Sequence, residues 1–366
     1  MKSLPGPAFK VEPYRVGLMG FSDGRVRVHK TLEETIVRHG RVLAEAIDSD
    51  PLLEVFPAGE IAYSAKLARQ GALELRGGGA EAAVFNIPVF AFPNFSLIAA
   101  RVLGMPVVLS SPKDGTLPGL GGIMASHGAM LQAGLRSQKL WGNPLEEPDL
   151  LKALSAFCRA SGVIERMKGS VYGLFGGRSI GMNTGVPNTA EWMRKFGVDV
   201  EHIDQLEIIR RAESVEDRQA EAGYKWLCDH AGRVSTEGKA GPEHVKGQLK
   251  HYIAFKQIIE ERGLDFVGIK CHIDLSEYFL TACASAMLLN DPYDWTGPRE
   301  PVVTACEADS DGALTMQILK LISGFPSLLF DVRSYDFRRK LFVCCNCGAQ
   351  PSWYCSPDTL SIAVTV

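Results

Sequence analysis

Short apolar runs alternate along this chain with stretches of helical spacing, and no other sequence feature constrains the fold as strongly. The first run is YRVGLMGF at residues 14–21, and later runs are LLEVFPA, AAVFNIPVFAF and PVVLSS. Segments such as NFSLIAARVLG, whose apolar residues recur at helical intervals, separate these runs. Thr31 and Glu34 have the spacing of a capping box and predict the start of the first helix there. Strands that alternate with helices predict a parallel sheet between helices.

A second series of the same kind begins near Met167. KGSVYGLFGGRSIGM predicts a strand followed by a glycine-rich turn, and FGVDVEHIDQLEIIRRAE predicts another strand and helix. With 366 residues, of which 46% are hydrophobic, the chain is long enough for two or three domains with buried cores. The sequence therefore predicts an α/β protein with two Rossmann-like, doubly wound parallel-sheet domains.

Composition argues against several classes of partner. The net charge of −3 provides no basic surface for nucleic acid. No run reaches the roughly 18 apolar residues of a membrane span, and the N-terminus lacks the apolar core of a signal peptide. Nine cysteines, an odd number, favour reduced thiols, so we expect a cytoplasmic protein. The glycines of GTLPGLGG do not form a dinucleotide-binding motif, which disfavours a nicotinamide oxidoreductase.

Residues 292–336 concentrate the candidate chemistry. An apolar run from Pro301 to Cys306 ends at Glu307, and the run PSLLF ends at Asp331, 24 residues later. Because ligands bind at the carboxyl ends of strands in open α/β sheets, the two carboxylates could converge on one site. Their hard oxygen atoms suit Mg²⁺ or Mn²⁺. The alternative, which the pattern leaves open, is that both residues cap helices or face solvent.

Several motifs together resemble the superfamily of L-fucose and L-arabinose isomerases, and its L-fucose isomerase branch in particular. They are DWTGPREP, ACEADSDGALTMQIL, LLFDVRSY, FSDGRVRVHKTLEET, MKGSVYGLFGGRSIGM and GIKC. The resemblance implies an aldose–ketose isomerase that acts on a monosaccharide of the fucose or arabinose type through an enediolate. It also implies that Glu307 and Asp331 bind a catalytic Mn²⁺, or another divalent cation such as Mg²⁺, and serve as acid and base. The assembly it implies is a homo-oligomer, a trimer or hexamer.

The same resemblance implies five substrate-binding residues. Arg25, in the motif Asp-Gly-Arg, would reach a sugar bound by a neighbouring subunit, and Phe90 would also contact the sugar. Lys270 stands where a glutamine is usual, and its ammonium favours an anionic or differently substituted sugar. Asn346 and Cys347 would form an active-site loop where fucose isomerases have Asn-Ser-Gly.

The resemblance also defines three domains and a missing ligand. The expected domains are 1–165 and 166–325, both α/β, and 326–366, the beginning of a truncated C-terminal β domain. A histidine of that last domain completes the metal shell in the family, whereas all eight histidines here precede Asp331. We therefore expect a truncated form with feeble metal affinity. The alternative function is a non-catalytic sugar-binding relative that lacks the C-terminal domain.

Overall fold

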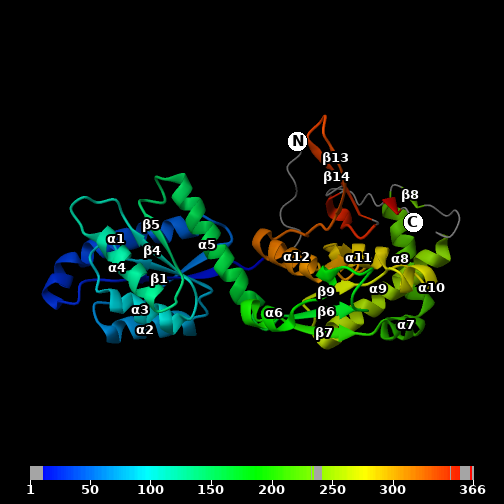
Figure 1. Cartoon of the computed structure of the whole chain (residues 1–366), viewed down its shortest axis with the longest axis horizontal. Coiled ribbons are helices and arrows are strands. Elements are labelled where there is room, and N and C mark those ends of the chain that lie inside the picture. Colours follow the sequence, from blue (N-terminus) through cyan, green and yellow to red (C-terminus); the bar gives the residue numbers. More distant parts are fainter. Residues whose placement is uncertain (1–10, 232, 235–240, 347, 355–362, 365–366) are drawn as a thin grey trace. The chain divides into compact units, whose positions relative to one another are not determined.

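The computed structural model describes residues 11–231, 233–234, 241–346, 348–354 and 363–364. Contacts within the chain divide it into two compact units, Val11–Arg166 and Met167–Val366, each with its own parallel sheet (Figure 1). The α/β class with two parallel sheets is thereby confirmed. The domain boundaries expected at 165–166 and at 325–326 stay predictions.

The first unit contains a five-stranded parallel sheet in the order β2-β1-β3-β4-β5. Its strands are β1 (Tyr14–Gly20), β2 (Leu53–Pro57), β3 (Ala82–Asn86), β4 (Val107–Ser111) and β5 (Ser137–Trp141). The strand order reverses between β1 and β3, and the crevice at the carboxyl ends of two such strands is where doubly wound sheets bind ligands.

Five helices cover the two faces of this sheet (Figure 1): α1 (Val26–Asp48), α2 (Ala65–Gly77), α3 (Pro93–Leu103), α4 (Gly119–Gln132) and α5 (Pro148–Met167). Side chains alternate across β1, so Met19 shares a core with α2, α3 and α4. Tyr14 points to the other face, where Gly162 of α5 leaves room for its ring. Ile36 of α1 lies over Gly20 on that same face.

The first helix begins earlier than the capping box predicted. α1 starts at Val26, and its N-cap residue Arg25 makes no side-chain cap bond. Thr31 lies inside the helix, where its hydroxyl donates to the carbonyl of Val28 at 2.7 Å. The expected capping role of Thr31 and Glu34 is therefore wrong, because the same residue spacing also fits a helix interior in which threonine bonds back to the preceding turn.

The second unit contains a four-stranded parallel sheet in the order β12-β9-β6-β7. The strands are β6 (Val171–Phe175), β7 (Asp199–Ile203), β9 (Phe266–Ile269) and β12 (Val303–Cys306). The helices are α6 (Thr189–Phe196), α7 (Gln205–Glu213), α8 (Asp217–His230), α9 (Pro242–Arg262), α10 (Asp274–Tyr278), α11 (Cys283–Asn290) and α12 (Ser310–Ser323), and 3₁₀ turns span Asn183–Gly185 and Ser352–Tyr354. Here the strand order reverses between β6 and β9.

Different layers cover the two faces of the second sheet. On one face, α9 is central, and its Tyr252 and Phe255 are fully buried in a core shared with α7, α8 and α11. On the other face, Tyr172 packs against Trp192 of α6 at 5.4 Å between ring centroids, and its hydroxyl donates to Ser310 of α12 at 3.1 Å. The central strands β6 and β9 are thus covered on both sides, which explains why they are almost continuously apolar, whereas the edge strand β7 (DVEHI) is largely polar.

Beyond α12 the chain forms an antiparallel hairpin of β13 (Asp331–Asp336) and β14 (Leu341–Cys345). The short antiparallel pair β10 (Tyr293–Asp294) and β11 (Gly297–Pro298) precedes β12, and β15 (Ala363–Val364) pairs in parallel with β8 (Arg233–Val234). The run PSLLF, residues 326–330, forms no strand, so Asp331 begins the hairpin and does not end a strand. In the part of the chain that the structure describes, no helix is both long and apolar enough to cross a bilayer.

Two phenylalanines provide a matched test of this architecture. Phe255→Ala should destabilise the second unit by about 3–5 kcal/mol, because it leaves a cavity in the core around α9. Phe342→Ala, on the hairpin, should change the free energy of unfolding by less than about 0.5 kcal/mol, since its side chain is 69% exposed. Urea unfolding followed by tryptophan fluorescence measures both changes. Equal losses in the two variants would contradict the layer arrangement.

Candidate active site in the second unit

Glu307 directly follows β12, in a turn that redirects the chain. Glu307 and Ala308 both adopt the left-handed conformation, with φ values of 55° and 54°, which non-glycine residues rarely adopt. Ala308 is fully buried, and its N–H donates to the carbonyl of Ile269 in β9 at 3.0 Å. Gly268 of β9 leaves the space for this approach, because a Cβ there would lie 3.1 Å from the Cα of Ala308. Close contact with β9 thus holds the strained turn.

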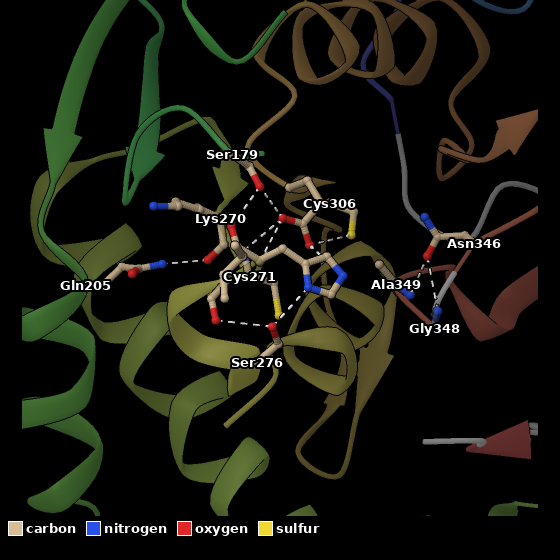
Figure 2. Close-up of polar contacts among 12 residues, drawn as sticks. Ser179, Gln205, Lys270, Cys271, Ser276, Cys306, Asn346, Gly348 and Ala349 are labelled. Carbon is tan, nitrogen blue, oxygen red and sulfur yellow. Dashed lines mark hydrogen bonds and ion pairs between the residues drawn. The ribbon is translucent and has the colours of Figure 1, made fainter. Parts of the chain in front are cut away.

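The carboxylate of Glu307 is fixed through one of its two oxygens. Oε2 accepts hydrogen bonds from the backbone N–H of His272 at 2.9 Å and of Cys271 at 3.3 Å, and the hydroxyl of Ser179 lies at 2.5 Å. The Ser179 hydroxyl also lies 3.0 Å from the carbonyl of His272, and with a single proton it donates to one acceptor at a time. Figure 2 shows Ser179, Cys271 and Cys306 converging in one cluster.

These donors come from the ends of the two strands between which the strand order reverses. Ser179 follows β6, in a loop that the guanidinium of Arg178 braces through the carbonyl of Met182 and the side chain of Asn183. Cys271 and His272 follow β9. The Glu307 carboxylate therefore lies at the carboxyl edge of the sheet, where a doubly wound sheet binds its ligand.

The second oxygen of Glu307, Oε1, has longer contacts than Oε2. The thiol of Cys306 and the Nε2 atom of His272 each lie 4.0 Å from Oε1, and neither is a close donor. The Glu307 side chain is 14% exposed and that of His272 is 50% exposed. The arrangement can therefore offer an oriented carboxylate oxygen to a substrate proton or to a cation.

Lys270, a predicted sugar contact, is the first residue after β9. Its ammonium pairs with Asp274 of α10, and the pKa of that carboxyl lies below its usual range because it accepts a hydrogen bond from Lys270. The carbonyl of Lys270 accepts a bond from Gln205 at 2.6 Å, and in Figure 2 its side chain extends away from Cys306. Because Asp274 already compensates its charge, Lys270 is a weak anion site in this conformation.

Asp331, the second predicted metal ligand, is exposed at the start of β13. The two carboxylates therefore do not end neighbouring strands of one sheet, as the sequence had suggested. Among the residues that the structure describes, no three His, Cys, Asp or Glu side chains are grouped as a metal site. Glu307 fits the role of a ligand through Oε1, and the described residues alone do not complete a three-residue site.

Asn346 follows β14, and its side-chain oxygen accepts bonds from the N–H groups of Gly348 at 3.1 Å and Ala349 at 2.9 Å. Figure 2 shows this turn apart from the Ser179 cluster. The other predicted loop residue, Cys347, lies outside the described residues. The chain after the turn is anchored by buried Asp291, which accepts bonds from the Ser352 hydroxyl at 2.7 Å and the Trp353 N–H at 3.1 Å.

Arg25 and Phe90 lie in the first unit, after β1 and β3 respectively, the two strands between which that sheet reverses its order. Arg25 donates to the Asp23 carboxylate through Nε at 2.9 Å and Nη2 at 2.7 Å, and this guanidinium holds the pKa of Asp23 below its usual range. The Arg25 side chain is 70% exposed and Phe90 is 41% exposed. Both predicted residues are thus accessible at the ligand-binding edge of their own sheet.

Sequence reasoning missed Ser179, His272 and Cys306. Ser179 and His272 follow the ends of β6 and β9, so the rule that pointed to Lys270 could have included them. Their orientation toward Glu307, across 128 and 35 residues, carries no sequence signal.

The second unit thus carries a fixed carboxylate at the edge of its sheet where doubly wound sheets bind their ligands. Residues 13–169 match the family described as "L-fucose isomerase, first N-terminal domain". The first domain belongs to that family, and the chain is a distant relative of L-fucose and sulfoquinovose isomerases.

Three curated relatives illustrate the distance. The sulfoquinovose isomerase of Clostridium sp. (strain MSTE9) is 24% identical, over 60% of this chain and 47% of its own length. The L-fucose isomerase of Vibrio vulnificus is 23% identical, over 59% and 42%. That of Bacteroides fragilis is also 23% identical, over 88% and 61%. The chain thus spans about half the length of the curated relatives it matches.

The buried carboxyl group of Asp291 predicts how the stability of the fold depends on pH. Burial raises the pKa of this carboxyl to about 7, against about 3.9 in the unfolded chain. Between these values the folded state retains a proton that the unfolded state has lost, so stability falls as pH rises from about 4 to about 7 and then levels off. Asp291→Asn should remove this slope, of up to about 1.4 kcal/mol per pH unit. Urea unfolding across this range measures it.

The exposed Asp149 of α5 provides the control, because Asp149→Asn should leave the pH profile of stability unchanged. If Asp291→Asn kept the wild-type slope, the buried carboxyl would not be its source.

Proposed function

We propose that this protein is an aldose–ketose isomerase that acts on a monosaccharide, with Glu307 as a catalytic carboxylate. The observation that carries the proposal is the position of Glu307 at the switch point of the second sheet, where donors after β6 and β9 hold Oε2 at 3.3 Å or less and the contacts to Oε1 are longer, at 4.0 Å. Two kinds of relative, named L-fucose isomerase and sulfoquinovose isomerase, support the reaction class.

The reaction requires a base that removes a proton from the carbon next to the carbonyl and returns it to the neighbouring carbon. A carboxylate fixed at one oxygen suits that role, because its other oxygen keeps one position during both transfers. We assign proton transfer to Oε1 of Glu307 and keep Asp331 as the proposed second carboxylate.

We further propose that a divalent cation, Mn²⁺ or Mg²⁺, takes part and that Glu307 and Asp331 are among its ligands. Such an ion, when bound, stabilises negative charge on the two substrate oxygens of an enediolate. Oε1 of Glu307 is an oxygen ligand of the hard kind that these ions select.

The comparisons do not identify the sugar or the oligomeric state, so both are part of our proposal. We propose a sugar of the fucose or arabinose type, contacted by Arg25, Phe90, Lys270, Asn346 and Cys347. We also propose a cytoplasmic homo-oligomer, in which Arg25 reaches a sugar bound by a neighbouring subunit. The Asp23 carboxylate orients the Arg25 guanidinium for such a contact and leaves Nη1 with donors to spare.

Glu307→Gln is the direct test of the proposed reaction. The variant keeps the shape of the side chain but loses the base, so Mn²⁺-dependent turnover of a panel of aldoses and ketoses should fall about 10²–10⁴-fold. Glu277→Gln, at an exposed position of α10, is the control and should retain activity. Saturable sugar binding by the wild type without turnover would instead favour the non-catalytic sugar-binding alternative.

Arg25→Ala tests the contribution of the first unit. Loss of a charge-assisted hydrogen bond to the sugar should raise KM about tenfold, with a smaller effect on kcat. Arg27→Ala is the matched control, because Arg27 lies two residues later in α1 and is also exposed. Steady-state kinetics measures both constants, and an unchanged KM in Arg25→Ala would remove this residue from the substrate site.

A further inference from the structure

The first unit contains a cavity that neither the sequence pattern nor the resemblance assigned to a site. It has a volume of about 520 Å³ and lies between α1 and the loops that follow β4 and β5, at the carboxyl edge of the sheet. Sites for small molecules have volumes of roughly 300–1,000 Å³. We propose that this cavity, beside His39, is a second binding site, for a neutral, hydroxyl-rich small molecule such as a sugar or polyol. The inference goes beyond the proposed function, because it needs neither Glu307 nor a metal ion.

His39 of α1 lines the cavity, and its imidazole is fixed in one tautomer. The side-chain nitrogen of Asn86, at the end of β3, donates to the carbonyl of Ile36 at 2.8 Å, so the amide oxygen of Asn86 faces His39. Nδ1 of His39 lies 2.7 Å from that oxygen, which can only accept, and Nδ1 therefore carries the proton. Gly40 leaves the space for this contact, because a Cβ there would lie 3.1 Å from the Asn86 nitrogen. The free lone pair is thus on Nε2.

Nε2 of His39 has no hydrogen-bond partner among the residues that the structure describes, and His39 is only 6% exposed. Burial lowers the pKa of His39, so the ring is neutral near pH 7 and Nε2 is an acceptor. A buried acceptor without a donor is unfavourable, and a ligand hydroxyl in the cavity would supply that donor. Because Nε2 is itself buried, the hydroxyl reaches it only when neighbouring side chains of the cavity wall shift.

The charged lining residues favour a neutral ligand. They are the cations of Arg38 and Lys113 and the carboxylates of Asp114, Glu146 and Glu147. Lys113 already pairs with Glu147, so the lining as a whole disfavours a phosphate. A hydroxyl group can donate to a carboxylate and accept from a guanidinium, and therefore suits both signs of charge. The described lining also contains no Phe, Tyr or Trp on which a nucleobase could stack.

The cavity is formed by the first unit alone and lies apart from the predicted sugar contacts of that unit. Neither Arg25 nor Phe90 is among the described residues that line it. Arg25 is the N-cap residue of α1, fourteen residues before His39, which corresponds to about 21 Å along the helix axis. A ligand beside His39 would therefore occupy a different place from a sugar that Arg25 contacts.

Nuclear magnetic resonance of the histidine ring nitrogens in the full 366-residue chain tests the inference. Glycerol, ribitol, mannitol and glucose are the probes, and His39→Gln identifies the His39 signals by their loss. A bound polyol should shift the Nε2 signal of His39 saturably, in the direction of a hydrogen-bonded nitrogen, and leave Nδ1 protonated. Absence of a saturable shift with all four probes would overturn the site. A stronger response to inorganic phosphate would overturn the neutral class of ligand.

Two tryptophan substitutions in α1 form a matched pair that leaves His39 in place. Thr35→Trp fills the cavity from its wall and should weaken polyol binding about tenfold or more. Glu33→Trp, at an exposed position two residues earlier that does not line the cavity, should retain the wild-type affinity. Equal binding by the two variants would contradict the location, even if His39→Gln failed to fold.

Glu307→Gln separates this inference from the proposed function. The variant should lose turnover and keep the shift of the His39 signal. A saturable shift in a chain that turns over no sugar would support the His39 site and count against the isomerase. Loss of the shift in Glu307→Gln would show that His39 responds to events in the second unit, and the independent site would be wrong.

Discussion

The hydrogen bonds accepted by one oxygen of Glu307 are the constraint on which the candidate site depends. They join three strand ends, because their donors follow β6 and β9 and their acceptor follows β12. Two successive left-handed residues, each costing roughly 1–2 kcal/mol, are needed to place the carboxylate there. The burial of Ala308 against Gly268 and the bonds on Oε2 offset that cost. Strain held by its surroundings in this way is characteristic of functional positions.

The sequence predicted the two parallel sheets because strands such as β3, β4, β6 and β9 are short apolar runs bounded by turn residues, whereas the edge strands β5 and β7 are largely polar. It predicted the position of Glu307 for the same reason, since the end of β12 coincides with the end of such a run. It failed at residues 326–330, which are equally apolar but pack along the chain that follows α12. There the Ser327 hydroxyl donates to the carbonyl of Met316, and the Tyr354 hydroxyl donates to that of Pro326. Tertiary contacts overrode the strand preference of PSLLF.

The two units use the same structural position for their candidate residues. In the first sheet Arg25 and Phe90 follow the two strands that flank the reversal of strand order, and in the second sheet Ser179 and His272 do so. Sequence patterns locate such positions, because strand ends can be predicted. They do not locate the contact between His272 and Glu307, which depends on a turn whose left-handed residues are neither glycine nor asparagine.

Within the second unit, the hairpin of β13 and β14 projects from the helices that cover the sheet, and the chain before it and the chain after it lie close together (Figure 1). Phe325 lies before it and Trp353 after it, and their rings pack with centroids 5.5 Å apart. The Tyr354 hydroxyl bonds to the carbonyl of Pro326, and Asp291 anchors Ser352 and Trp353. The segment between these contacts is therefore a closed loop, and the entropy of closing a loop grows only with the logarithm of its length. Insertions at the hairpin tip would lengthen this excursion at small cost and leave the sheet that holds Glu307 undisturbed.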